Sequence, residues 1–373
     1  MSHIKTRFQL SFFSQNTNTI KLRVAWGYTL IFTLVFCLNL AVASCKSQLI
    51  NNSTAKTQNA PSNLTKVVRI GYQRFGALFY LKAKNSLEKR LAKMGWSVEW
   101  TEFTAGPPIL EAIGKGKIDL GYAGVAPPIF AQSEGVPFVY IANDSALPGS
   151  MGIIVPQDSL IRTLADLKGK KIAATQKTAG HYLLIRVLTQ GGLQLKDAQF
   201  VDLPPPKTQE AFVRGEVDAW AIWQPFLAQL QETMPVHFLA NSDRLMNDRN
   251  FYLASRSFAS EFPDIVKIVM GETRQMATWI TKNPQRAAEF ISARTGMKIT
   301  TAIMLTKSRR YDLLPIQDRA VEEQQRIAEI FFRLGLIPDR IGIEDVIGKQ
   351  KLDLSNQNLG KGNDKSTVAI PQV

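Results

Sequence analysis

The chain has 373 residues, of which 45% are hydrophobic and 20% charged, and its formal net charge at pH 7 is +14. This length is enough for two domains with a sizeable core. Two cysteines and three histidines without metal-ligand spacing argue against a disulfide framework or a zinc site. Basic residues are mixed with acidic ones, and no basic run is interleaved with aromatic residues, which argues against a nucleic-acid groove.

Residues 1–45 have the pattern of an export signal. A leader with four cations and no acid precedes the apolar run 24–42, and small residues follow it. The last four residues, Val42-Ala43-Ser44-Cys45, are similar to a bacterial lipobox. We therefore expect cleavage and lipidation at Cys45, and a protein anchored to a membrane in the periplasm or at another extracytoplasmic face. An uncleaved transmembrane anchor is the alternative, because the apolar run is long enough to span a bilayer.

Polar segments flank the expected fold. Residues 46–65 are rich in Ser, Asn, Thr and Gln and predict a flexible tether, and residues 349–373 predict a disordered tail. Between them we expect two α/β lobes. Lobe I takes residues 66–150 and 252–348, and lobe II takes residues 151–251.

Alternating apolar and amphipathic segments support this division. In lobe I we expect a helix over 78–93 and strands over 97–103 and 136–142. The segments 151–155 and 250–255 are interpreted as the two crossings between the lobes. After the second crossing, four helices are predicted to pack on lobe I, over 264–281, 284–295, 300–308 and 317–334.

An internal repeat relates the two lobes. Residues 111–119 (EAIGKGKID) align with residues 210–218 (EAFVRGEVD), and each copy predicts a helix, a glycine stop and a strand. Such βαβ units form parallel sheets with right-handed crossovers. We interpret Asp119 and Asp218 as structural residues that hold backbone near a strand start, since a carboxylate would repel an anion.

The second lobe contains a candidate anion site. Residues 172–175 predict a strand, residues 176–180 a polar turn, and the apolar spacing from His181 onward a helix. The unpaired N–H groups and the dipole at a helix N-terminus attract anions. Thr178 is a suitable N-cap, and the small residues after it leave the backbone accessible. An ordinary strand-to-helix turn is the alternative.

Ligands of parallel α/β sheets bind beyond the carboxyl ends of the strands. Two facing lobes would place four such ends around one cleft, after Tyr72, Gly121, Thr175 and Ala221. The two crossings would act as a hinge that closes on the ligand.

Six segments in order resemble the substrate-binding proteins of ABC importers for aliphatic sulfonates: 68–73 (VRIGYQ), 103–108 (FTAGPP), 118–132 (IDLGYAGVAPPIFAQ), 164–173 (LADLKGKKIA), 178–184 (TAGHYLL) and 217–225 (VDAWAIWQP). The resemblance implies a type II periplasmic-binding-protein fold, with two α/β lobes joined by two crossover segments around a ligand cleft. It also implies capture of an alkanesulfonate or a taurine-like anion and its delivery to a permease with an ATPase subunit.

The resemblance also suggests site residues. The anion pocket would be lined by Gln73, Ala123, Gly124, Val125, Thr178, Ala179, Gly180 and His181, and the organic tail by Trp220 and Trp223. On a strand, Trp220 and Ile222 share one face and Trp223 points away, so at most one tryptophan need lie in the core. At least one of the two is therefore expected to contact ligand. The turn 123–125 has no hydroxyl where family members often carry one, which leaves the identity of the sulfonate open. His181 would either donate to the anion or serve a structural role.

Other ligands and other classes of protein remain as alternatives. Related folds bind nitrate, bicarbonate or a heteroaromatic, pyrimidine-like precursor, and a desulfinase-like enzyme uses a cysteine nucleophile. Beyond Cys45, the mature chain has no candidate thiol and no G-x-S-x-G motif. We therefore predict a binding protein, not an enzyme, without cofactor, metal or nucleic acid, and monomeric. A sensor that contacts a membrane receptor is a further alternative.

Overall fold

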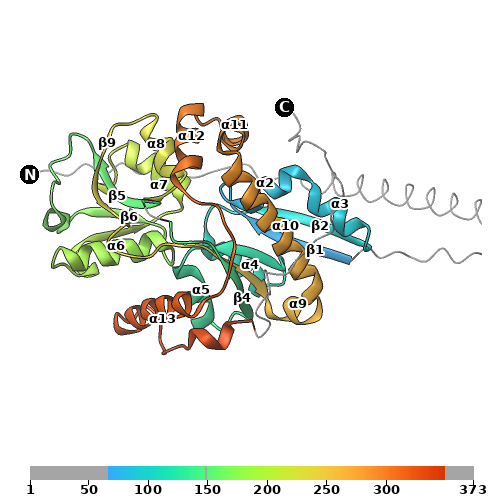
Figure 1. Ribbon diagram of the computed structural model, residues 1–373. Coiled ribbons are helices and arrows are strands. Elements are labelled where there is room, and N and C mark those ends of the chain that lie inside the picture. Colours follow the sequence, from blue (N-terminus) through green and yellow to red (C-terminus); the bar gives the residue numbers. More distant parts are fainter. Residues whose placement is uncertain (1–65, 148, 349–373) are drawn as a thin grey trace, which may run out of the picture. The chain divides into compact units, whose positions relative to one another are not determined.

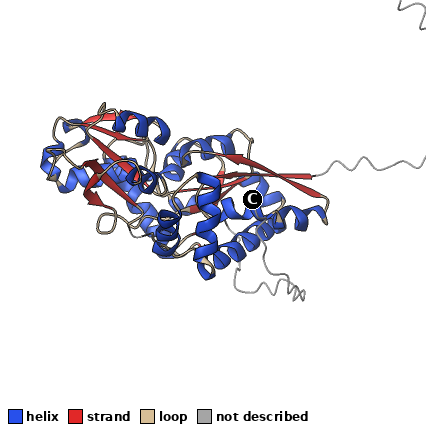
Figure 2. Cartoon of the chain, turned by 90° about the horizontal axis from the view of Figure 1, so that it is seen from above, coloured by secondary structure: helices blue, strands red, loops and turns tan. Residues whose placement is uncertain are grey.

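The computed structural model describes residues 66–147 and 149–348, which form two β-sheets, each with helices around it (Figures 1 and 2). The predicted signal segment, the lipid site at Cys45, the tether and the tail lie outside the described residues. Within 66–147 and 149–348, no helix is both long and apolar enough to cross a membrane.

The first sheet, here sheet A, has six strands in the order β11-β4-β10-β3-β1-β2. β1 is parallel to β2 and β3, whereas β10 is antiparallel to its neighbours β3 and β4. The bounds are Lys66–Tyr72 for β1, Trp96–Glu102 for β2, Leu120–Ala123 for β3, Phe138–Asn143 for β4, Phe251–Ser255 for β10 and Leu314–Pro315 for β11.

The second sheet, sheet B, has five strands in the order β7-β6-β8-β5-β9. β6 is parallel to β7 and β8, and β5 is antiparallel to β8 and β9. The bounds are Met151–Pro156 for β5, Lys171–Ala174 for β6, Gln199–Asp202 for β7, Ala219–Trp223 for β8 and Val236–Asn241 for β9.

The chain thus passes from sheet A to sheet B between β4 and β5, and returns between β9 and β10. The predicted α/β class with two lobes and two crossovers is confirmed, while the exact bounds of the lobes stay a prediction. The segments 151–155 and 250–255 were predicted to be the crossings, and this prediction is wrong. They are strands β5 and β10, and each runs antiparallel to its neighbours because it enters its sheet from the other lobe.

Helices cover both sheets. Their bounds are Ala77–Lys84 (α2), Ser86–Ala92 (α3), Gly106–Gly114 (α4), Ala126–Ser133 (α5), Ala179–Gln190 (α6), Pro205–Val213 (α7), Phe226–Gln231 (α8), Arg256–Glu261 (α9), Pro263–Lys282 (α10), Pro284–Thr295 (α11), Ile299–Ser308 (α12) and Asp318–Arg333 (α13). The single helix expected over 78–93 is wrong. Asn85 has a left-handed φ of 55°, which ends α2 and starts α3.

Three helices connect the lobes away from the sheets. The Phe331 ring of α13 lies 4.7 Å from the Phe130 ring of α5 and 5.6 Å from the Tyr182 ring of α6. Since α6 belongs to lobe II and α5 to lobe I, this aromatic cluster fixes α6 against lobe I. Of the C-terminal helices, α10 contacts α2 and α3 of lobe I and α13 contacts α5, as predicted, whereas α12 also contacts α8 of lobe II.

The repeated aspartates have the predicted structural role. Asp119 accepts a hydrogen bond from the backbone N–H of Arg69 at 2.8 Å, and Asp218 accepts one from the N–H of Lys171 at 2.7 Å. In each lobe the carboxylate therefore precedes one strand and holds the backbone of the adjacent parallel strand. The repeat is thus a structural unit that aligns two strands.

We expect removal of these carboxylates to lower the free energy of unfolding. Asp119 is buried, so Asp119→Ala leaves a backbone donor unsatisfied and costs about 1–3 kcal/mol. Asp218→Ala costs less, because water can reach the Lys171 N–H. Urea unfolding measures both, with Asp339→Ala, an exposed aspartate, as a control near zero. Equal stability of Asp119→Ala and the wild type would contradict the assignment.

Candidate functional site

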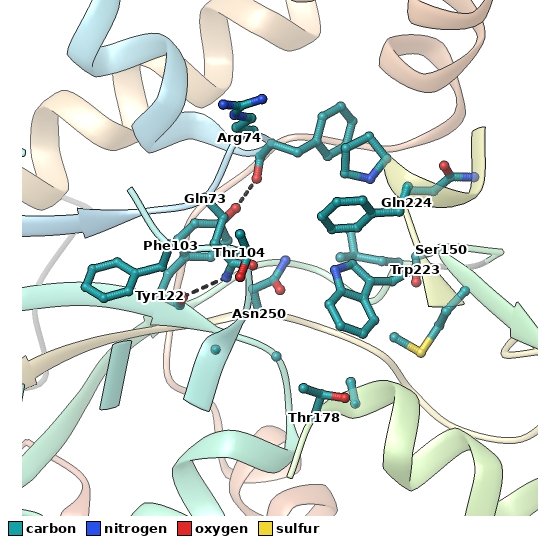
Figure 3. A pocket seen from close by; sticks show the side chains of 18 of the residues that line it. Gln73, Arg74, Phe103, Thr104, Tyr122, Ser150, Thr178, Trp223, Gln224 and Asn250 are labelled. Carbon is teal, nitrogen blue, oxygen red and sulfur yellow. Dashed lines mark hydrogen bonds between the residues drawn. The ribbon is translucent and has the colours of Figure 1, made fainter. Parts of the chain in front are cut away.

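A cavity of about 250 Å³ lies between the lobes and is lined by both. Figure 3 shows Gln73 and Thr104 on one side of it, Trp223 and Gln224 across from them, and Thr178 below. Part of the lining comes from the carboxyl ends of strands in both sheets, where parallel α/β sheets bind ligands.

All four strand ends expected at the cleft contribute to this lining. Gln73 follows β1, Gly124 follows β3, Thr178 and Ala179 follow β6, and Trp223 ends β8. The Gln73 amide donates to the Tyr122 carbonyl at 3.2 Å, which ties the end of β1 to β3. The two lobes therefore bring together these five of the predicted residues.

The N-terminus of α6 opens into the cavity. The Thr178 hydroxyl oxygen accepts from the His181 N–H at 3.3 Å and donates to the Thr175 carbonyl at 2.6 Å. This predicted N-cap serves the third residue of the helix. The N–H groups of Ala179 and Gly180 come before any acceptor of their own helix, and of these two residues Ala179 lines the cavity.

Trp223 lies against this first turn of α6. A Cβ atom on Gly180 would come within 3.0 Å of the Ala221 carbonyl oxygen and 3.2 Å of the Trp223 ring. Glycine at this position therefore lets the ring pack directly beside the helix N-terminus. An aromatic surface and a set of backbone donors are thus adjacent in one wall of the cavity.

The other predicted residues support the lining from behind. Ala123, Val125, Gly180, His181 and Trp220 are buried and do not line the cavity. Both tryptophans were expected to contact the ligand tail, but Trp220 packs in the core with Ile222, and Trp223 lines the cavity. Ligand contact by these five stays a prediction.

Several polar residues that line the cavity were not predicted from the sequence. Arg74, Thr104, Ser150, Gln224, Asn250 and Arg309 line the cavity. Thr104, Ser150 and Gln224 lie next to predicted strands, so a search of all strand ends could have found them. Arg309 lies outside the repeated units, and its local sequence carries no signal for a cleft. Asn250 begins the segment 250–255, which the sequence indicated as a crossing but not as part of the site.

Acidic groups of the lining already have partners. Glu102 accepts from Arg74 Nε at 2.6 Å, and Asp248 accepts from the Ser150 hydroxyl at 2.5 Å. In the described part of the chain, no cluster of three or more His, Cys, Asp or Glu side chains could hold a metal ion.

Residues 92–287 match the family described as NMT1/THI5 like. The chain belongs to this family. The alkanesulfonate-binding protein SsuA from Xanthomonas axonopodis pv. citri, solved bound to MOPS, is 32% identical with a TM-score of 0.71, over 76% of this chain and 98% of that one. The periplasmic aliphatic sulphonate binding protein SsuA from Escherichia coli is 31% identical with a TM-score of 0.67, over 76% and 92%.

A curated relative from Escherichia coli (strain K12), whose name refers to the binding of aliphatic sulfonates, is 34% identical over 292 residues, or 77% of this chain and 90% of that protein. The resemblance found in the sequence motifs is therefore confirmed. The likeness to both SsuA structures also confirms the type II periplasmic-binding-protein fold in this NMT1/THI5-like chain.

His181 is held between aromatic rings in this family member. Its ring stacks 5.0 Å from Phe200 and 6.5 Å from Phe130, and its Nδ1 accepts from the Lys177 N–H at 3.4 Å. Burial lowers the pKa of His181 to about 4, although the Asp202 charge opposes this shift. The imidazole is therefore neutral at pH 7 and brings no positive charge to the anion site.

This burial should appear in the pH dependence of stability. The folded-state pKa of His181 lies below its ordinary value near 6.5. The stability that the buried neutral ring contributes is therefore complete above pH 6.5 and is lost as the pH falls toward 4. The loss is about 3 kcal/mol in the free energy of unfolding. We expect His181→Phe to remove this part of the decline in urea unfolding between pH 7 and 4.5. His237→Phe is the matched control and should keep it; equal declines in both variants would refute the assignment.

Proposed function

We propose that this protein is an extracytoplasmic solute-binding protein that captures an aliphatic sulfonate and delivers it to an ABC import permease and its ATPase. One observation carries the proposal: the N-terminus of α6 opens, beside the Trp223 ring, into a cavity between two lobes of the fold shared with SsuA. The first feature suits an anionic head, and the second suits an organic tail.

The chemistry of a sulfonate fits these groups. It is fully ionised and presents three acceptor oxygens, so backbone N–H groups at Ala179 and Gly180 can bind it without a proton transfer. Hydrogen bonds to a charged group contribute about 1.5–3 kcal/mol each, and micromolar affinity needs about 8 kcal/mol. Several such bonds, with burial of the tail against Trp223 and Phe226, reach this value.

Binding without chemistry is part of the proposal. Both cysteines of the sequence, Cys37 and Cys45, precede residue 66, so none lies among the residues that line the cavity. His181 is neutral and lies behind the lining, which leaves it unsuited to act as a general base on a bound sulfonate.

The first 65 residues support a proposal for the cellular setting. We propose that the signal is cleaved, that Cys45 carries lipid, and that residues 46–65 tether a monomeric binding domain to the membrane. A lipid-anchored protein could then find its permease within the plane of the same membrane.

Titration calorimetry on the purified protein tests the ligand class. We expect methane-, ethane-, butane- and hexanesulfonate to bind with affinity that rises with tail length, because each buried CH₂ contributes about 0.8 kcal/mol. Nitrate and bicarbonate should bind far more weakly. Binding of one of these anions, or of a pyrimidine-like compound, with no response to any sulfonate would overturn the proposal.

Trp223→Leu should separate tail binding from head binding. We expect the affinity for hexanesulfonate to fall about tenfold to a hundredfold, and that for methanesulfonate to change little, because the short ligand has almost no tail to bury. Phe238→Leu, which changes an exposed aromatic residue of the same lobe outside the lining, should bind both ligands like the wild type. Equal losses for the two ligands would place Trp223 away from the tail.

A further inference from the structure

Arg309 is a buried cation in the wall of the cavity. It follows α12, and its side chain is only 14% exposed. The guanidinium lies 4.6 Å from the Tyr311 ring and 5.2 Å from the Phe75 ring. Its nearest carboxylate, that of Asp144, is 3.4 Å away, and among the described residues its buried Nε has no hydrogen-bond partner. A buried donor without a partner is costly, so this group suits a ligand acceptor.

The two crossovers meet beside this side chain. Asp144 lies in the first crossover, and its N–H donates to the Asn250 carbonyl of the second at 2.9 Å. The Asn250 amide returns a bond to the Asp144 carboxylate at 3.0 Å. Farther along, Leu147 N–H donates to the Asp248 carbonyl at 2.8 Å. Arg309 therefore contacts the segments on which any movement of the lobes depends.

The charges in this cluster do not balance. Asp144 and Asp248 are both buried, and with Arg309 they sum to −1 when both are ionised. Burial raises the pKa of each carboxyl to about 6, against the opposing effect of Arg309. The facing tyrosines, Tyr80, Tyr122, Tyr252 and Tyr311, have raised pKa values and stay neutral. Asp312, also nearby, pairs with Arg310 and bonds to Ser145.

We propose that Arg309 binds the anionic group of the solute, and that the carboxylate pair Asp144 and Asp248 takes up one proton from solvent as the solute binds. The inference rests on the proposed function in one respect, that the solute is an anion. An anion beside Arg309 repels two buried carboxylates, and protonation of one of them removes much of that repulsion. The bound state therefore holds more protons than the free state.

The direction in which pH changes the affinity for the anion follows from this proton uptake. The anion raises the carboxyl pKa values above their free-state value near 6, so affinity is highest below pH 6 and declines as the pH rises through the bound-state values. For one proton, the decline is at most tenfold per pH unit, and we expect about threefold to tenfold between pH 6.5 and 7.5.

Calorimetry with butanesulfonate tests the proton uptake directly. Titrations at pH 6.5 and 7.5 in phosphate and in imidazole, two buffers that carry no sulfonate and differ in ionisation enthalpy, give the number of protons bound. We expect about one-half to one proton per ligand. Asp248→Asn, which keeps an acceptor for Ser150, should reduce the uptake and bind more tightly than the wild type at pH 8.

Three arginine variants test the role of Arg309. Arg309→Gln should weaken binding at least about tenfold and lose the pH dependence, Arg309→Lys should recover part of both, and Arg286→Gln, at an exposed position of α11, should behave as wild type. Wild-type binding of butanesulfonate without proton uptake, or undiminished binding by Arg309→Gln, would overturn this inference and leave the proposed function standing. If the wild type binds no sulfonate or other anion, the proposed function itself fails.

Discussion

The N–H groups of a helix's first turn have no acceptor within the helix, and the cavity of this protein is arranged around one such set. The α6 N-terminus needs an external acceptor, and burial in a cleft makes that requirement stronger. Two features keep the donors available. Thr178 caps the third residue and not the first two, and Gly180, which has no Cβ, lets the Trp223 ring pack close to the turn. The aromatic cluster of Phe130, Phe331 and Tyr182 then fixes this helix against the other lobe.

A cleft between lobes is useful only if ligand contact is connected to the segments that join them. Here both crossovers are hydrogen-bonded to each other through Asp144 and Asn250, and the cavity wall includes Asn250, Asp248 and Arg309. A solute that contacts these residues therefore also contacts the segments that join the lobes. This arrangement places Arg309 and Asp248 beside the segments that join the lobes, and the N-terminus of α6 lines the same cavity.

The sequence alone predicted those parts of the molecule whose structure is determined by local pattern. Strand alternation separated Trp220 from Trp223, and the repeat located Asp119 and Asp218 at equivalent places because each unit folds by the same local rules. It failed where the backbone conformation of a single residue, or tertiary packing, determines the structure. A left-handed Asn85 breaks a continuous amphipathic pattern, and Arg309 reaches the cavity from the C-terminal helical segment, which has no counterpart in the repeat.

The positions of the aspartates along the chain explain how an anion cleft tolerates so many acids. Asp119 and Asp218 precede β3 and β8, so the length of a strand separates each from the carboxyl ends that face the cavity. Asp144 and Asp248 lie at the opposite ends, in the crossovers, where an anion would feel their charge most strongly. A carboxylate at that place is compatible with an anionic ligand only if a cation or a proton compensates it. Arg309 supplies one charge for two carboxylates, and this imbalance is the basis of the proton uptake proposed above.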